Sequence, residues 1–359
     1  MQHAKIWAAL CWLAIACQAF QVMPVLAADG DDQLDTGDAL VESGSERVAI
    51  TGTVELELSS GGGASDIRLA TAELDVTADI APALGADLVF LWEEDEGTVE
   101  LDEGYITIAN SEKCPFSLLG GKLVVPFGVY DTYMVQDPLS LELGEVGDTA
   151  LVLNLAHDSG LEASVYGFNG DWREAGKDET IATFGAGIGY GLGTDNLAVH
   201  LRADWINNLA DAEVLSEVML EGMPAAELSD YVAGLALTFA IDLGPVSLLA
   251  DYVAALDNFQ PAELAFNGQG AEPAVLNVEA ALGAELFGRK STLAVGYQVT
   301  DECVALGFPE SRYLTTARTE VFEAGSLALE YLHDEDYSLA DQGTGTDADQ
   351  VTLQLAVEF

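Results

Sequence analysis

Apolar and polar residues alternate in many segments of this 359-residue chain. Residues 54–58 read Val-Glu-Leu-Glu-Leu, and residues 73–80 also alternate between polar and apolar positions. The pattern is clearest in residues 351–359, where Val, Leu, Leu, Val and Phe occupy every second position. Successive side chains of a β-strand point to opposite faces, so this period of two predicts strands with one apolar and one polar face.

The whole chain divides into strand-like segments bounded by Gly, Asn, Asp or Pro. We predict sixteen strands, most of them about ten residues long, which is the length of a membrane-crossing strand. Their predicted ranges are 48–58, 67–80, 84–93, 98–109, 117–127, 150–157, 160–168, 181–191, 196–207, 230–242, 245–255, 274–287, 291–301, 312–323, 325–334 and 350–359.

The connections between these strands alternate between short turns and longer polar loops. The short ones include 81–83, 158–159 and 243–244, whereas 169–180 and 208–229 are long. An even strand number with short turns on one side is typical of a transmembrane β-barrel. The strands of a soluble β-sandwich or propeller would also alternate between polar and apolar residues, but neither fold explains the unequal loop lengths. A propeller would also require a sequence repeat of 20 to 50 residues, and none is visible. We therefore predict an all-β fold, a transmembrane antiparallel β-barrel of about 16 strands, porin-like and without a plug domain.

The first residues have the features of a secretory signal peptide. A weakly basic start is followed by an apolar run from Ile6 to Phe20, and small residues end this region at Ala27. This order is typical of a cleaved signal. We predict a signal peptide at 1–27, a short acidic segment at 28–46 and the barrel at 47–359, located in the bacterial outer membrane.

Composition adds a strong acidic bias. The chain contains 61 Asp and Glu but only 12 Lys and Arg, a formal net charge of -49, and half of its residues are hydrophobic. Disorder is excluded because disordered chains are poor in apolar residues, and nucleic acid is an improbable partner because its binding requires basic residues. In a barrel the apolar residues face outer-membrane lipid, while the acids face water in the lumen and loops.

The polar positions of the strands are the predicted lining of the pore. The inward side chains are expected to be Glu55, Glu57, Glu73, Asp75, Asp79, Asp87, Lys122, Arg202 and Asp204. Carboxylates in a narrow aqueous pore favour cations, so we expect a cation-preferring or weakly selective channel. An alternative explanation of the acidity is adaptation to high salt, which screens exposed charges.

One long connection, residues 128–149, is unusually apolar for an outer loop. It contains Met134, Leu139, Leu141 and Leu143, and apolar groups require a place in which to be buried. We predict that this third outer loop folds into the barrel and narrows the pore; an ordinary packed surface loop or a trimer contact are the alternatives. The constriction is expected to use Tyr130, Asp131, Tyr133, Asp137, Glu142 and Glu145.

Residues 119–145 resemble a known family of outer-membrane proteins. The segment Leu-Gly-Gly-Lys-Leu-Val-Val-Pro-Phe-Gly-Val-Tyr-Asp-Thr at 119–132, Asp-Pro-Leu at 137–139 and Leu-Glu-Leu-Gly-Glu at 141–145 are similar to the LbtU-type siderophore porins. The resemblance implies a sixteen-stranded barrel that takes up a ferric siderophore without energy coupling. The alternative functions are a general or ion-selective diffusion porin, including a phosphate-porin-like one, and an outer-loop receptor or adhesin.

Enzymatic activity is not expected. His157, Asp158 and Ser159 have the residue types of a catalytic triad, but they are neighbours in one short turn, where triad geometry is not expected. Two Asp-rich segments, 29–32 and 334–336, lack the ordered spacing of a calcium loop. We expect no cofactor and no metal, and as partners outer-membrane lipid and a small hydrophilic solute; the sequence leaves open whether three barrels associate as a homotrimer.

Overall fold

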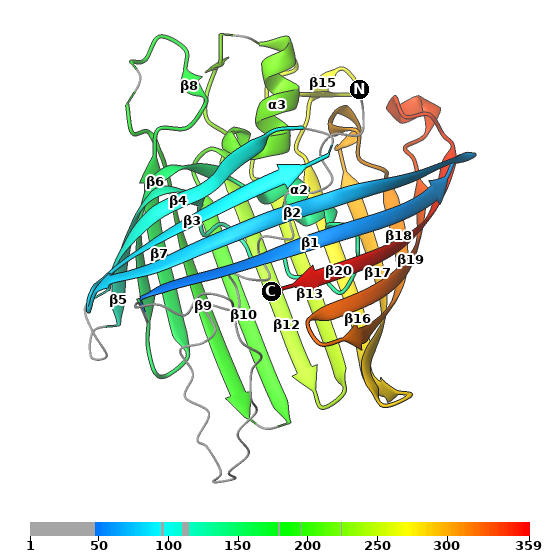
Figure 1. Ribbon diagram of the computed structural model, residues 1–359. Helices are drawn as coiled ribbons and strands as arrows, with labels where there is room; N and C mark the ends of the chain where they lie inside the picture. Colours follow the sequence, from blue (N-terminus) through cyan, green and yellow to red (C-terminus); the bar gives the residue numbers. More distant parts are fainter. Residues whose placement is uncertain (1–46, 95–96, 110–114, 179, 195, 224) are drawn as a thin grey trace.

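The computed structural model describes residues 47–94, 97–109, 115–178, 180–194, 196–223 and 225–359. Sixteen antiparallel strands form a closed barrel in which neighbours in sequence are neighbours in space, and β20 pairs with β1 to complete it (Figure 1). The barrel strands are β1 (Val48–Gly61), β2 (Ala64–Ala81), β3 (Leu84–Glu93), β4 (Val99–Ala109), β5 (Phe116–Val124), β6 (Gly147–Ala156), β7 (Leu161–Phe168), β9 (Thr183–Thr194), β10 (Leu197–Ile206), β12 (Gly234–Leu243), β13 (Val246–Ala255), β16 (Ala274–Leu286), β17 (Arg289–Asp301), β18 (Ser311–Phe322), β19 (Gly325–Glu335) and β20 (Asp347–Glu358).

The outer connections contain the remaining elements. They are the short strands β8 (Arg173–Glu174), β11 (Glu227–Leu228), β14 (Ala265–Phe266) and β15 (Gln269–Gly270), the helices α2 (Leu139–Gly144) and α3 (Glu213–Gly222), and the 3-10 turns η2 (Leu209–Asp211), η3 (Val304–Leu306) and η4 (Leu339–Asp341). No helix in the described part of the chain is long and apolar enough to cross a membrane.

The predicted barrel is confirmed, and its sixteen strands correspond one to one to the predicted ranges. The largest difference is at β12, which begins four residues later than predicted, whereas β2, β6 and β20 begin three residues earlier. The first outer connection is a tight turn at Gly62 and Gly63, both with positive φ, which glycine adopts without strain. The predicted signal peptide and acidic segment, residues 1–46, lie outside the described residues.

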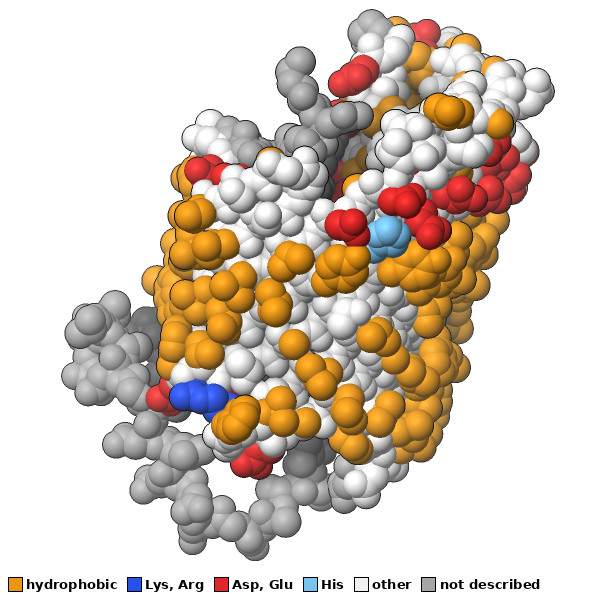
Figure 2. All heavy atoms as spheres, turned by 90° about the vertical axis from the view of Figure 1, so that its right-hand side faces the viewer, with side chains coloured by type: hydrophobic (Ala, Val, Ile, Leu, Met, Phe, Trp, Pro, Cys, Tyr) orange, Lys and Arg blue, Asp and Glu red, His pale blue; other side chains and the backbone are white. Residues whose placement is uncertain are grey.

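The outer surface of the wall is apolar, as the alternation predicts. Val54, Leu56 and Leu58 on β1 are each about two-fifths exposed, whereas Glu55 and Glu57 between them are buried inside. Figure 2 shows the apolar side chains covering the wall, with acidic side chains and a histidine gathered along its upper margin. A continuous apolar surface of this kind is stable against lipid.

The interior contains an apolar core built mainly by outer connections. Leu141 and Leu143 of α2, Leu215 of α3 and Trp172 are almost fully buried in one cluster, which also includes inward side chains of β5 to β7 such as Leu123. The apolar residues of the third outer loop are therefore buried inside the barrel, beside residues of later loops.

Candidate functional site

The third outer loop, residues 125–146 and called L3 below, follows the inner surface of the barrel wall. Near its start, Arg202 of β10 donates a hydrogen bond from Nη2 to the carbonyl of Pro126 at 3.2 Å. On β12, the Thr238 hydroxyl accepts a hydrogen bond from the Val129 amide at 3.3 Å and donates one to the Val129 carbonyl at 3.1 Å. L3 thus turns inward directly after β5.

Glu279 of β16 holds the middle of L3. One carboxylate oxygen accepts from the Thr132 hydroxyl at 2.7 Å, and the other accepts from the Tyr133 amide at 2.8 Å. Asn277, on the same face of β16, donates to Glu279 at 3.2 Å and so fixes the carboxylate from the wall side. Both oxygens of one buried carboxylate therefore bind the loop.

Glu330 of β19 holds the far end of L3 in the same way. Its two oxygens accept hydrogen bonds from the amides of Val135 and Gln136, at 2.5 and 3.0 Å. The Thr316 hydroxyl donates to the same carboxylate at 2.7 Å. L3 consequently reaches from β5 to β19, and three of its four hydrogen bonds to Glu279 and Glu330 come from main-chain amides.

L3 returns toward β6 through α2. Gln298 of β17 accepts from the Leu139 amide at 3.1 Å at the first residue of this helix, and α2 then packs beside β13, β16 and α3. Leu139, Leu141 and Leu143 are buried in the apolar core. The structure therefore places L3 inside the barrel, where it occupies part of the lumen.

The predicted constriction residues divide into two groups. Asp131, Tyr133 and Glu142 are partly exposed within the barrel. Tyr130 is wrong as a constriction residue because its side chain is 3% exposed and its hydroxyl donates to the Phe127 carbonyl at 2.8 Å. The aromatic ring fills the apolar core instead of facing the pore.

Asp137 and Glu145 are also wrong as rim residues, since they are 3% and 6% exposed. Burial, followed by the nearby Glu213 carboxylate, raises the pKa of Glu145 well above its usual range. The Glu213 amide donates to the Glu145 carbonyl at 2.9 Å, which joins the end of L3 to the start of α3. These acids belong to the packing of loop against loop.

Most of the predicted pore-lining acids do face inward. Asp75 and Asp87 are partly exposed, and Asp79 is exposed near the end of β2. Glu55, Glu57 and Glu73 are only 2%, 0% and 6% exposed. Arg68 contacts Glu57 at 3.1 Å and Gln354 donates to it at 3.0 Å, so a predicted lining acid is held in a network between β1, β2 and β20.

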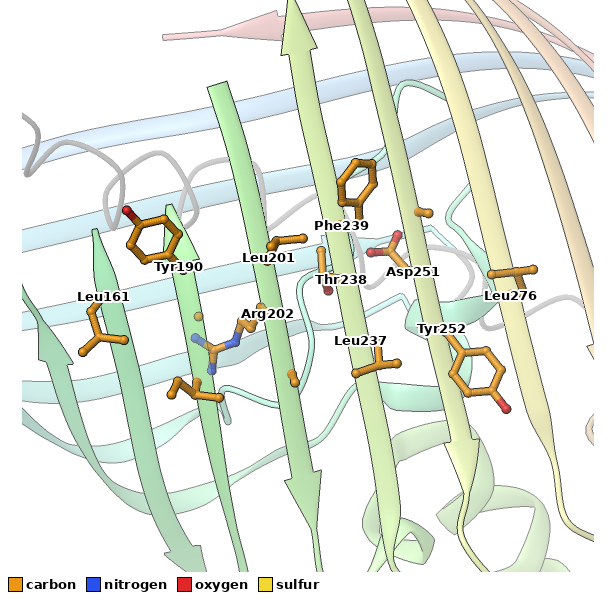
Figure 3. Close-up of a pocket in the computed structure, with 14 residues that line it drawn as sticks. Leu161, Tyr190, Leu201, Arg202, Leu237, Thr238, Phe239, Asp251, Tyr252 and Leu276 are labelled. Atoms are coloured by element: carbon orange, nitrogen blue, oxygen red, sulfur yellow. The ribbon is translucent and has the colours of Figure 1, made fainter. Parts of the chain in front are cut away.

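Arg202 and Asp204 form an inward ion pair on β10. The guanidinium contacts both carboxylate oxygens, at 2.6 and 2.8 Å, and also donates to Ser164 at 2.9 Å. The facing strand β9 has glycines at its inward positions, including Gly187, which leaves the space that this pair fills. Figure 3 shows this part of the wall, with Leu201 beside Arg202 and a shallow apolar groove on the outer side.

Lys122 is wrong as a pore-lining residue. Lys122 lies on the same face of β5 as the exposed Phe116 and Leu118, and its Nζ donates to the Leu101 carbonyl at 3.0 Å. The inward neighbour is Leu123, buried in the core. Because L3 fills the lumen here, inward positions of β5 are apolar too, and alternation no longer distinguishes the two faces.

The sequence prediction missed the residues that hold L3. Glu279 and Glu330 were not among the predicted inward residues, although each lies between apolar residues in a strand, as in Val278-Glu279-Ala280. The same pattern marks Asp251, which is 1% exposed. Alternation could have placed all three inside the barrel.

The turn at 157–159 does bring two triad residues together. His157 Nδ1 lies 2.9 Å from Ser159 Oγ, closer than expected, and also accepts the Ser159 amide at 3.1 Å. Both residues are exposed, and these contacts close the turn between β6 and β7. Among the described residues, no group of three or more His, Cys, Asp or Glu has an arrangement that could hold a metal ion.

A closed sixteen-stranded barrel with an apolar outer wall and an inward third loop defines an outer-membrane protein with the porin fold. Solved structures share it: the outer-membrane channel DcaP of Acinetobacter baumannii has a TM-score of 0.58 at 15% identity, with 87% of this chain and 97% of that chain covered. An anion-selective porin from Comamonas acidovorans has a TM-score of 0.59 at 12% identity, covering 87% of this chain and 99% of that one. The protein is thus placed in the bacterial outer membrane.

Curated relatives carry the description UPF0422 protein. One from Legionella pneumophila (strain Lens) is 28% identical over 334 residues, 82% of this chain and 62% of the relative. One from Coxiella burnetii (strain RSA 493 / Nine Mile phase I) is 26% identical over 312 residues, 84% of this chain and 67% of the relative. The chain therefore spans less than two thirds of the Legionella protein. No protein-family model matches the chain.

Proposed function

We propose that the protein is an outer-membrane channel for passive diffusion of small hydrophilic solutes, with L3 as its constriction. The observation that carries this proposal is the attachment of L3 inside the barrel through paired hydrogen bonds to Glu279 and Glu330. A loop fixed across part of the lumen narrows the aqueous path through the barrel without blocking it. The proposed function is not enzymatic.

We propose a preference for cations. Asp75, Asp79 and Asp87 present carboxylates to the lumen. Of the inward arginines, Arg68, Arg202 and Arg312 each contact an acid, and Arg318 donates to the Met134 carbonyl at 3.2 Å. Lys122, which would have supplied positive charge, lies on the outer face. Charges of one sign in a confined aqueous path raise the local concentration of the opposite ion.

The reversal potential across a planar bilayer with a KCl gradient tests this preference. We expect the potential of a cation-selective channel, and the double variant Asp75→Asn with Asp87→Asn should lower the cation-to-anion permeability ratio about twofold. The matched control, Asp230→Asn with Asp257→Asn, removes two exposed acids of outer connections and should leave the ratio nearly unchanged. Anion preference in the unmodified protein would contradict the proposal.

Ferric siderophores are the finer solute class that we propose, on the resemblance of residues 119–145 to siderophore porins. These residues form the end of β5 and L3, the part of the chain argued to set the constriction. Proteoliposomes without an energy source should accumulate a radiolabelled ferric siderophore to equilibrium. If the liposomes conduct KCl normally but exclude the ferric complex, the siderophore proposal is rejected and the proposal of a general diffusion channel stands.

A further inference from the structure

Asp251 of β13 and Asn277 of β16 form a buried polar pair on the inner face of the barrel wall. They are register partners on neighbouring strands, and they are 1% and 0% exposed. Asn277 Nδ2 donates to Asp251 Oδ2 at 3.3 Å and to Glu279 at 3.2 Å, so the pair lies next to the residue that holds the middle of L3. Figure 3 shows Asp251 beside Thr238, its register partner on β12.

Each side chain of this pair has one buried oxygen atom that lacks a donor. Within the described part of the chain, neither Asp251 Oδ1 nor Asn277 Oδ1 has a hydrogen-bond partner. The amide nitrogen of Asn277 is already used twice, so the oxygen is the atom left over. Buried polar atoms of proteins almost always have a partner. Two acceptor oxygens on paired residues therefore indicate a ligand that is attracted by oxygen atoms.

The negative charge at this place has no basic partner. Among the described residues, no Lys, Arg or His forms an ion pair with Asp251 or Glu279. Asp131 of L3 adds a third carboxylate, which lies close enough to repel the charge of Asp251. By contrast, the inward Asp204 on β10 is paired with Arg202. Because buried charges are normally paired or coordinate a metal ion, the missing partner is expected to be a cation.

The type of ligand atom selects the kind of cation. A carboxylate oxygen and an amide oxygen are hard ligands, which suit Ca²⁺ and Mg²⁺ better than zinc or copper. Mg²⁺ demands a nearly ideal octahedron, whereas Ca²⁺ accepts six to eight oxygens in a flexible geometry that includes water. Strand pairing fixes the two oxygens of this pair, so the flexible ion fits better. Since one ligand is an asparagine, the place differs from a group of three acidic side chains.

We propose that one Ca²⁺ ion binds to Asp251 Oδ1 and Asn277 Oδ1 inside the barrel. Water molecules complete its coordination, and the nearby charges of Glu279 and Asp131 favour a divalent ion. The ion compensates the buried carboxylates at the point where L3 meets β13 and β16. Its influence on conductance, unlike the binding itself, rests on the proposed diffusion channel.

Equilibrium dialysis of the folded full-length protein in detergent, with radiolabelled CaCl₂ after treatment with a chelator, tests the proposal. We expect one saturable site per barrel that persists in excess KCl, which screens weak binding to exposed acids. Asp251→Asn retains the shape of the side chain and should weaken Ca²⁺ binding by about tenfold or more, because the affinity of such sites follows the charge of their ligands. Asn277→Asp adds a charged ligand and should strengthen binding, which a purely structural role of Asn277 would not produce.

The matched control is Asp211→Asn. Asp211 is also a buried acid, 6% exposed, but both of its oxygens accept hydrogen bonds, from the Trp172 amide and the Thr183 hydroxyl among others. This distant substitution should change Ca²⁺ affinity less than about twofold. Absence of a saturable site, or equal losses in Asp251→Asn and Asp211→Asn, would overturn the proposal and assign a proton or a buried water molecule to the pair. KCl conductance of the unmodified protein is measured separately, so a failure of Ca²⁺ binding is distinguished from a failure of the channel.

Discussion

Replacing Glu279 and Glu330 together by glutamine is expected to increase the single-channel conductance severalfold and to add large current fluctuations. Each carboxylate accepts two hydrogen bonds from L3, and a glutamine amide of the same shape retains only one acceptor oxygen. Losing one charge-assisted bond at each site costs about 1.5 to 3 kcal/mol, which favours detachment of the loop from the wall. Planar-bilayer recordings of the purified channel measure the effect.

Glu263→Gln is the matched control for this double variant. Glu263 also accepts two main-chain hydrogen bonds, from Ser229 at 2.7 Å and Gln260 at 2.9 Å, but it lies in an outer connection that does not hold L3. Its conductance should equal that of the unmodified protein. If the Glu279 and Glu330 variant conducts normally and quietly, L3 is not the element that limits the current.

Gly187→Ala is expected to destabilise the barrel by about 1 to 3 kcal/mol, the usual cost of overpacking a filled interior. A methyl group at this inward position of β9 would overlap the Asp204 carboxylate and lie 2.6 Å from Arg202 Nη2. Displacing the pair also removes the hydrogen bond from Arg202 to Pro126 at the start of L3. Urea unfolding, followed by the different gel mobility of folded and unfolded barrels, measures the loss.

Gly191→Ala is the matched control on the same strand. Its added methyl group would lie 3.8 Å from the nearest His200 atom, an ordinary van der Waals distance. We expect a change below about 1 kcal/mol, as for a glycine in a strand without a close neighbour. If both substitutions destabilise the barrel equally, β9 requires glycine for its backbone conformation. The room that glycine leaves for the Arg202–Asp204 pair would then not be the cause.

The barrel could be predicted because its physical cause is local. Most strands alternate along their own sequence, and Val54 and Glu55 reveal opposite faces without knowledge of their neighbours. The prediction of which side chains face the lumen failed where the inner face of a strand packs against a loop instead of facing water. On β5, Lys122 is outside and Leu123 inside, the reverse of the usual polarity, because the apolar core of L3 lies next to that strand.

The inward folding of L3 was predicted from its leucines, but its attachment was not. The apolar residues require burial wherever the loop lies, whereas the bonds to Glu279 and Glu330 depend on the closed shape of the barrel. Nothing in the local sequence of β16 distinguishes Glu279, which binds the loop, from an acid that lines water. The buried acids Asp137 and Glu145 were misassigned for the same reason, since their packing partners come from distant connections.

The anchors of L3 also set an order of assembly. Thr132 and Glu279 are 147 residues apart, and Val135 and Glu330 are 195 residues apart. Contacts between such distant residues form late, because the intervening chain must first be brought together. A partly assembled barrel that lacks β16 to β19 therefore lacks both carboxylate anchors of the loop and retains only the contacts of its first residues to β10 and β12. The middle of L3 is thus fixed only when the last strands have completed the wall.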